Sequence, residues 1–202
     1  MDILVTGDVY LGDRAVERIA EQGNVEMLFG DFASIIQESS LSITNLESPI
    51  INTGSAIEKT GPPLKSSTKS LDVLKKAGFN LLTLANNHIM DYGRPGLLST
   101  IRECDRLKLS HIGAGITSEL AAKPFTTIVG EKKISVLNFA ENEFSTIWSS
   151  ESCGANPIDP INNSYDIQRA KNESDLLIVI VHGGREHYEL PSPNFKKTLR
   201  FY

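Results

Sequence analysis

The sequence has little cysteine, and the two that are present show no metal-binding spacing. Cys104 and Cys153 lie far apart in the 202 residues and form neither a C-x-x-C pair nor a zinc-ligand pattern. We therefore expect no cysteine-based metal site. Cys104 falls on the apolar stripe of an expected helix, so we interpret it as a buried free thiol.

Runs of basic residues are also missing. The formal net charge is −5, and the lysines gather only in isolated pairs such as Lys75-Lys76 and Lys132-Lys133. A nucleic-acid-binding surface needs a basic patch or stripe. We therefore expect no nucleic-acid partner, and we interpret the lysine pairs as solvated surface.

Long apolar runs are absent as well. None approaches the roughly 18 residues needed to span a bilayer. A strand is expected directly after Met1-Asp2, without the pattern of a signal peptide. These features predict a cytoplasmic chain, but a chain trimmed of a membrane anchor would have the same pattern.

What the sequence does contain is a series of short apolar runs and amphipathic stretches, which we interpret as an α/β domain. Its length allows one sizeable domain or two small ones, and we take residues 1–202 as one. Strands are expected at 3–6, 41–44, 81–85, 125–129, 134–139 and 176–181, and a short one before the Gly113 turn. Helices are expected at 14–21, 26–38, 67–77, after Pro95, up to residue 171 and at 195–202.

Three stretches carry more specific expectations. The most apolar run, 176–181, predicts a central buried strand. Residues 51–67 have no periodicity and are rich in Gly, Ser, Thr and Pro, and a loop of this length is often a lid or a binding loop. Residues 143–165 are expected to be irregular. No capping residue follows the helix at 195–202, so we expect the chain to be the N-terminal part of a longer domain.

Four of the expected strands end in side chains that bind metals or anions. In chain order they are Asp8; Asn45 and Glu47; Asn86, Asn87, His88 and Asp91; and His182. Parallel strands lie about 4.8 Å apart, and α/β folds place their sites at the carboxyl ends of the strands. These side chains are therefore expected to converge, although four unrelated strand caps would give the same pattern.

The residue types predict metal-assisted hydrolysis. Mixed Asp, Glu, Asn and His ligation suits Mn, Fe, Zn or Mg. A divalent metal of this kind polarises a substrate and activates water. His88 lies next to Asn87 and is a candidate general acid for the leaving group.

At these residues the sequence resembles the CapA-type capsule and poly-γ-glutamate synthesis proteins. The shared motifs are Gly7-Asp8-Val9-Tyr10-Leu11-Gly12, Asn45-Leu46-Glu47, Ala85-Asn86-Asn87-His88-x-x-Asp91-x-Gly93, His111-x-Gly113-x-Gly115 and His182-Gly183-Gly184-x-Glu186. They occur in family order along nearly the whole chain. The resemblance implies a metallophosphoesterase-like α-β-β-α sandwich, with mixed sheets, outer helices and a metal centre at the strand ends, incomplete at its C-terminus.

The resemblance also implies roles for individual residues. His88 corresponds to the catalytic histidine, and the metal ligands are expected to be Asp8, Glu47, Asn87 and His182. The expected substrate contacts are Asn45, Asn86, Asp91, Glu186 and Tyr188. Two features depart from the wider superfamily: Tyr10 replaces a histidine two residues after the first aspartate, and a final His-x-His element is missing.

These features favour a divalent-metal-dependent hydrolase of phosphoesterase type in capsule or poly-γ-glutamate synthesis. The alternative is a non-catalytic assembly or binding module in the production of a polyanionic capsule or exopolysaccharide, which the two departures favour. A third reading is a truncated, unstable fragment. The expected partner is a polyanionic polymer or a small phosphorylated substrate, with membrane-associated synthesis machinery reached through other subunits.

Overall fold

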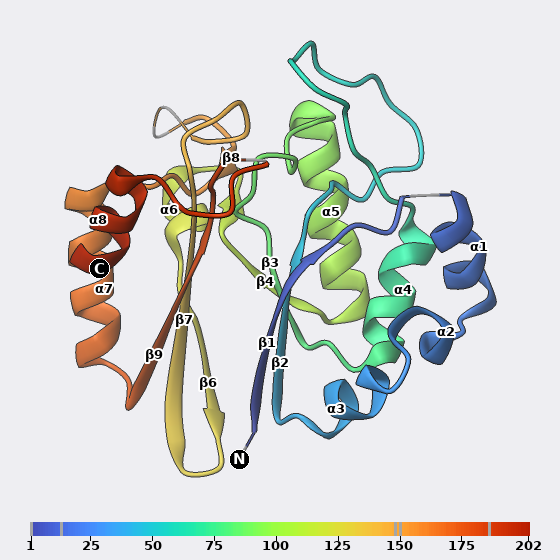
Figure 1. Cartoon of the computed structure of the whole chain (residues 1–202), viewed down its shortest axis with the longest axis horizontal. Helices are drawn as coiled ribbons and strands as arrows, with labels where there is room; N and C mark the ends of the chain where they lie inside the picture. Colours follow the sequence, from blue (N-terminus) through green and yellow to red (C-terminus); the bar gives the residue numbers. More distant parts are fainter. Residues whose placement is uncertain (1, 13, 148, 150, 186) are drawn as a thin grey trace.

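The computed structural model describes residues 2–12, 14–147, 149, 151–185 and 187–202. Two β-sheets lie face to face, and helices cover the outer face of each (Figure 1). This is the α-β-β-α sandwich that the family resemblance implies, and the expectation is confirmed. The layers place the apolar side chains in three clusters: one between the sheets and one under each helical layer.

The first sheet is parallel and has the strand order β1-β2-β3-β4. Its strands are β1 (Ile3–Val9), β2 (Leu41–Leu46), β3 (Leu81–Thr83) and β4 (Ser110–Ile112). The pairing of β1 with β2 is irregular between Val5 and Asp8 and is restored at Asp8↔Asn45. Both strands thus run further than the sequence predicts and carry Asp8 and Asn45 within the ladder.

The second sheet is mixed and has the order β6-β7-β9. An antiparallel hairpin joins β6 (Phe125–Val129) to β7 (Lys132–Ala140), as predicted, and β9 (Leu176–His182) pairs parallel to β7. The prediction of a central buried strand at 176–181 is wrong, since in the described sheet β7 is central and β9 lies at an edge, half-buried. Apolar composition identifies a strand but does not fix its place in the sheet.

Helices α1 (Arg14–Gln22), α2 (Val25–Phe29), α3 (Phe32–Glu38), α4 (Thr68–Ala77) and α5 (Gly93–Leu107) lie on the first sheet's side of the molecule. The single helix predicted at 26–38 is wrong. Gly30 adopts a φ of 54° and ends α2, and Phe32 begins α3. The helix predicted at 67–77 is present as α4, and its N-terminus is capped by Ser67, whose hydroxyl accepts from the Ser70 amide.

Helices α7 (Pro160–Asn172) and α8 (Pro193–Phe201) lie on the side of the second sheet (Figure 1). The segment at 143–165 is more regular than predicted, because it contains β8 (Gly154–Ala155) and the first turns of α7. β8 pairs antiparallel with β5 (Ala114–Gly115). The short helix α6 (Ser118–Ala122) follows β5 in the chain. Within the ranges described, no helix combines the length and the apolar character needed to cross a membrane.

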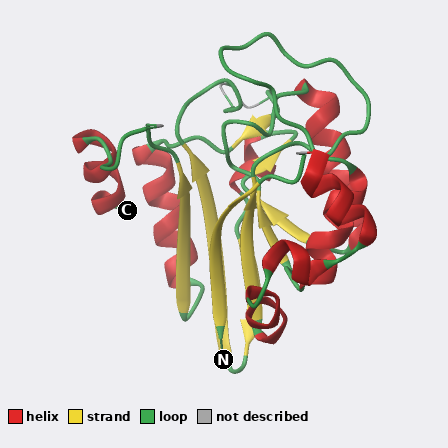
Figure 2. Cartoon of the chain, turned by 45° about the vertical axis from the view of Figure 1, so that its right-hand side comes forward, coloured by secondary structure: helices red, strands yellow, loops and turns green. Residues whose placement is uncertain are grey.

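The carboxyl ends of the parallel strands all reach the same end of the sandwich, where the long loops gather (Figure 2). Strand geometry makes this end the meeting point of side chains from both sheets. The loop at 51–67 also projects at this end, above α5 and α4 (Figure 1).

Candidate metal centre

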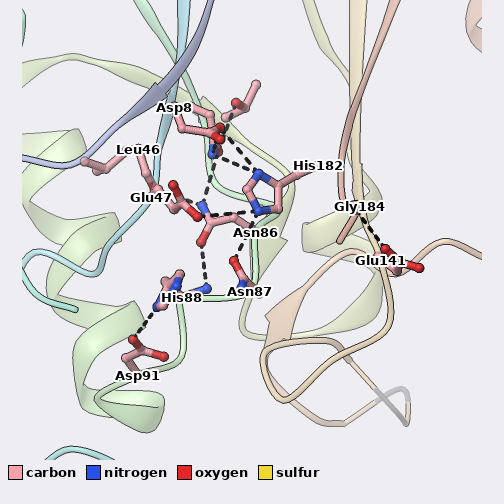
Figure 3. A network of polar contacts seen from close by, with 12 residues as sticks. Asp8, Leu46, Glu47, Asn86, Asn87, His88, Asp91, Glu141, His182 and Gly184 are labelled. Carbon is pink, nitrogen blue, oxygen red and sulfur yellow. Dashed lines mark hydrogen bonds and ion pairs between the residues drawn. The ribbon is translucent and has the colours of Figure 1, made fainter. Parts of the chain in front are cut away.

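Side chains from four strand ends meet at one point of the loop-rich end (Figure 3). Asp8 lies in β1, and Glu47 follows β2. Asn87 lies in the turn that follows β3, and His182 is the last residue of β9. The first three come from one sheet and His182 comes from the other, so the site depends on how the two sheets pack.

Asp8, Glu47 and His182 form a cluster of the kind that holds a metal ion. One ligand atom from each lies within 4.8 Å of the others. His182 Nδ1 lies 3.4 Å from Asp8 Oδ1, and His182 Nε2 lies 3.7 Å from Glu47 Oε1. The two ring nitrogens therefore face two different carboxylates.

Two asparagines complete the surroundings of this imidazole. Asn87 Oδ1 lies 3.1 Å from His182 Nε2, which adds an amide oxygen beside Glu47. Asn45 Nδ2 donates to Asp8 Oδ1 at 2.7 Å and lies 3.3 Å from His182 Nδ1. Asn45 is itself buried and accepts from Asn86 Nδ2 at 3.2 Å, so its orientation is fixed from behind.

Charge complementarity shifts the ionisation of this cluster. The hydrogen bond to His182 lowers the pKa of Asp8, and the Asn45 amide acts in the same direction against the opposing effect of partial burial. Burial acts to lower the pKa of His182, but the hydrogen bond and charge of Asp8, with the charge of Glu47, outweigh it and raise that pKa. Without a bound cation, the cluster therefore favours the ion pair of an aspartate and an imidazolium.

His88 belongs to a second, more enclosed cluster. Its Nδ1 lies 2.7 Å from Asp91 Oδ2, and Asp91 is fully buried. Lys59, from the long loop, donates to Asp91 Oδ1 at 2.5 Å and lies 3.1 Å from His88 Nδ1. The Leu64 amide donates to Asp91 Oδ2 at 2.6 Å.

Asp91 therefore carries an ionised carboxylate inside the protein. Burial alone would raise its pKa, but hydrogen bonds from His88, Lys59 and the Leu64 amide together lower it. The Ile57 amide also donates to the Asp91 carbonyl at 2.9 Å. Asp91 thus holds the long loop at Ile57, Lys59 and Leu64 and also orients His88.

Residues of both clusters line a single pocket of about 1120 Å³. Asp8, Glu47, Asn87, His88 and His182 lie on its wall. The long loop contributes Lys59 to Pro62 and Leu64, and the segment after β9 contributes Gly183 to Arg185, Tyr188 and Leu190. Carboxylates, cations and exposed apolar groups are therefore all within reach of one bound molecule.

The structure brings together most of the residues predicted from the sequence. Asp8, Glu47, Asn87, His88 and His182 share the pocket, and Tyr188 lies on its rim, 70% exposed. Asn45, Asn86 and Asp91, predicted as substrate contacts, are buried and hold protein groups instead. Glu186, also predicted as a substrate contact, lies outside the described residues.

Sequence reasoning missed several residues of the pocket. Lys59 is the most important, because it pairs with Asp91 and its side chain is only 4% exposed. Glu141 accepts from the Gly184 amide at 2.9 Å and lines the pocket with Glu143 and Phe144. The length and composition of the loop at 51–67 indicated a binding loop, but no pattern singled out its one buried cation.

A family comparison decides what kind of protein carries this site. The family described as bacterial capsule synthesis protein PGA_cap matches residues 2–202. The chain belongs to this family. The resemblance carried by the strand-end motifs is therefore confirmed.

Curated relatives of this PGA_cap chain include two Bacillus proteins. The PGA biosynthesis protein CapA of Bacillus subtilis is 29% identical over 199 residues, which cover 96% of this chain and 52% of the relative. The capsule biosynthesis protein CapA of Bacillus anthracis is 26% identical over 96% of this chain and 49% of its own length. The PGA_cap chain thus spans about half the length of these relatives.

The solved structures that match this chain are less similar to it in sequence. A chain titled a novel phosphatase, from Mycoplasma pneumoniae, is 20% identical, covers 90% of this chain and 54% of its own length, and gives a TM-score of 0.46. A hypothetical protein from Thermus thermophilus is 13% identical over 92% of this chain and 59% of its own length, with a TM-score of 0.49.

Proposed function

We propose that this PGA_cap chain carries a divalent-metal-dependent hydrolase site of phosphoesterase type that serves capsule or poly-γ-glutamate biosynthesis. The observation that carries the proposal is the convergence of Asp8, Glu47 and His182 within 4.8 Å, with His88 on the wall of the same pocket. A binding surface alone would not require this combination of paired carboxylates, imidazole and a second, oriented histidine.

The donor set fits a divalent cation. Two carboxylates, one imidazole and the Asn87 amide oxygen are the hard and borderline ligands that Mn, Fe, Zn and Mg accept. The side chains of Asp8 and Glu47 are 51% and 23% exposed, so their oxygens are reachable from the pocket. We therefore assign Asp8, Glu47, Asn87 and His182 as the residues that would hold the metal.

A metal bound there would supply positive charge that polarises an ester oxygen and lowers the pKa of water. The remaining work falls to the protein. Asn45 fixes Asp8 through its amide, and Asn86 fixes Asn45 and the Leu46 carbonyl, so the carboxylate is held before substrate arrives. Preorganised donors of this kind reduce the reorganisation needed during reaction.

His88 is placed to protonate a leaving group. Its Nδ1 is held by Asp91, and among the described residues no hydrogen bond engages its Nε2. As an imidazolium, His88 donates Nδ1–H to Asp91 and offers Nε2–H to the pocket. A proton held at Nε2 can pass to the departing oxygen of an ester, which is general acid catalysis.

With a metal bound by the carboxylates, the pocket would suit an anionic substrate. Arg185 lines the pocket as a further cation, and Tyr188 adds an aromatic surface. We propose a small phosphorylated molecule or a polyanionic polymer as substrate, and a membrane-associated synthesis machinery, reached through other subunits, as the wider partner. The names of the Bacillus relatives, which refer to PGA and capsule biosynthesis, support this class.

Metal content tests the proposal. Elemental mass spectrometry of the purified chain should find about one equivalent of Mn, Fe or Zn, and the Asp8→Ala/His182→Ala variant should lose it. The matched control is Asp31→Ala/His111→Ala, which removes an exposed aspartate whose side chain caps no helix and a histidine that lines a different cavity. Hydrolysis of aryl phosphate monoesters and diesters should follow the metal and should be lost in His88→Ala.

A different result would favour the non-catalytic alternative. No metal in the wild type after Mn²⁺ or Zn²⁺ reconstitution would overturn the metal assignment. Tyr10 lines the pocket at a position where the wider superfamily has histidine. That replacement would then support the loss of metal binding. The chain would in that case be a binding or assembly module of capsule production.

A further inference from the structure

The candidate metal centre is divided between two sheets, and something must fix their relative position. Asn87 follows β3 of the first sheet, whereas His182 ends β9 of the second. Between the sheets lies a layer of aliphatic side chains that includes Leu81 and Ile178. Apolar burial is non-directional, so it holds the sheets together without setting a register between them.

One buried side chain connects the two sheets close to the site. Asn138 lies in β7, is 2% exposed, and its amide bonds in both directions. Its Oδ1 accepts from the Ala85 amide at 2.7 Å, and its Nδ2 donates to the Ile180 carbonyl at 3.2 Å. Ala85 precedes Asn87 by two residues, and Ile180 precedes His182 by two residues.

The neighbouring chain reinforces this connection. Asn156 Nδ2 donates to the Asn138 carbonyl at 3.1 Å, and the Asn156 carbonyl accepts from the Ala140 amide at 2.9 Å. The backbone N–H of Asn156 donates to the Gly113 carbonyl at 2.8 Å, and Gly113 directly follows β4 of the first sheet. The backbone around Asn138 is therefore tied to both sheets as well.

Gly113 makes room for the Asn138 side chain. A Cβ atom at residue 113 would lie 2.0 Å from Asn138 Oδ1 and 2.8 Å from the Ala85 nitrogen. Gly113 also has a φ of 90°, which side-chain-bearing residues rarely adopt. The metal assignment left the motif His111-x-Gly113-x-Gly115 unexplained, and this close approach gives its first glycine a role.

We propose that Asn138, accommodated by Gly113, is a positioning residue that sets the separation of Asn87 and His182 and so assembles the metal centre. Hydrogen bonds are directional, and a buried amide that satisfies two backbone groups on different sheets restricts sliding of one sheet over the other. The effect on the metal centre rests on the proposed metal site. The clamp itself, by which we mean the two hydrogen bonds of the Asn138 side chain to Ala85 and Ile180, is a property of the metal-free protein.

The first test needs no metal. The ring nitrogens of the four histidines are followed by ¹⁵N NMR in the metal-free full chain, for the wild type, Asn138→Ala, Gly113→Ala and the control Asn163→Ala. Asn163 is an equally buried asparagine that bonds Asp159 and Tyr202, on the outer helix α7. We expect the His182 resonances to move in both clamp variants and to stay in place in Asn163→Ala.

Hydrogen exchange gives a second reading of the same variants. Loss of Asn138 Oδ1 leaves the Ala85 amide without its acceptor, so its exchange should be at least tenfold faster in Asn138→Ala than in Asn163→Ala. Should Asn138→Ala fail to fold, Asn138→Ser takes its place, because serine is too short to reach both partners. Unchanged His182 resonances in folded clamp variants would overturn the proposal.

Metal titration then separates this inference from the proposed function. Residues that orient metal ligands typically contribute 10–100-fold to metal affinity. We expect Mn²⁺ binding to weaken by about that factor in Asn138→Ala and Gly113→Ala, and to be unchanged in Asn163→Ala. A wild type that binds no Mn²⁺ would contradict the proposed metal function, whereas equal affinity in wild type and clamp variants would contradict the positioning role alone.

Discussion

Two histidines at the same end of the molecule each face an aspartate, but in different settings. The side chain of Asp8 is 51% exposed and lies 3.4 Å from His182, which reaches it from the other sheet. Asp91 is fully buried, lies 2.7 Å from His88 three residues away, and has Lys59 as a second partner. The open pair leaves donor atoms available to a ligand, whereas the closed pair satisfies its charges within the protein.

The difference separates binding from orientation. A carboxylate that faces the pocket can exchange a protein partner for a cation at little cost. A buried carboxylate that loses its partners leaves an uncompensated charge, which is costly. We therefore expect the Asp8 cluster to control metal affinity and the Asp91 cluster to control stability and the orientation of His88.

The largest expected effect is on the free energy of unfolding when Asp91 is removed. Asp91→Ala leaves the buried cation of Lys59 without its partner and releases the Leu64 amide. We expect a destabilisation of about 3–5 kcal/mol, the range for breaking a buried ion pair. Urea unfolding followed by circular dichroism measures it.

Asp8→Ala and Asp31→Ala are the comparisons for that measurement. Both carboxylates are exposed, so each change should cost at most about 1 kcal/mol. Similar losses in Asp8→Ala and Asp91→Ala would remove the distinction between the two clusters. Lys59→Met combined with Asp91→Ala should be strongly non-additive, since either change alone breaks the same pair.

The next effect is on metal affinity, which we expect to depend on the Asp8 cluster and not on the Asp91 cluster. Asp8→Asn removes the charge of one assigned ligand while keeping its shape, and we expect Mn²⁺ affinity to fall by at least the 10–100-fold typical of supporting residues. Lys59→Arg, which keeps the cation beside Asp91, should bind Mn²⁺ as the wild type does. Isothermal titration of the three proteins measures both, and a wild-type affinity in Asp8→Asn would contradict the ligand assignment.

The convergence of the site was predictable because it follows from strand geometry. Parallel strands bring their carboxyl ends to one edge, so polar residues directly after apolar runs identified Asp8, Glu47, Asn87 and His182. The sandwich itself came from the family resemblance and not from periodicity. What failed was strand order, because the apolar composition of β9 is the same at an edge as at the centre.

The closed cluster was less predictable because it depends on a loop. The sequence shows Asp91 as a polar residue near His88, and only the fold reveals that it is buried under residues 57–64. Lys59 stands among Gly, Pro, Ser and Thr with no periodicity to mark it. Asn138 was equally hidden, since it lies inside β7, where a buried polar residue has no distinguishing pattern until its partners on the other strands are known.

The smallest expected effect is the pH dependence of the metal-free protein, in which the two clusters act at opposite ends of the scale. The pKa of Asp91 is lowered on folding, so its contribution to stability is complete above the unfolded pKa near 3.8 and is lost as the pH falls through the folded value. The pKa of His182 is raised, so its contribution is complete below about 6.5 and is lost as the pH rises through its folded value.

Asp8 is half-exposed, so solvent screens its interaction with His182. We therefore expect the contribution of His182 to stability to be under about 1 kcal/mol. Unfolding free energies measured between pH 3 and pH 9 in the presence of chelator should therefore decline slightly on the alkaline side in the wild type, and His182→Gln should remove that decline. His111→Gln is the matched histidine control. A decline on the alkaline side that persists in His182→Gln would mean that another group is responsible for it. The pair of Asp8 and His182 would then lack the electrostatic coupling that distinguishes it from an ordinary surface contact.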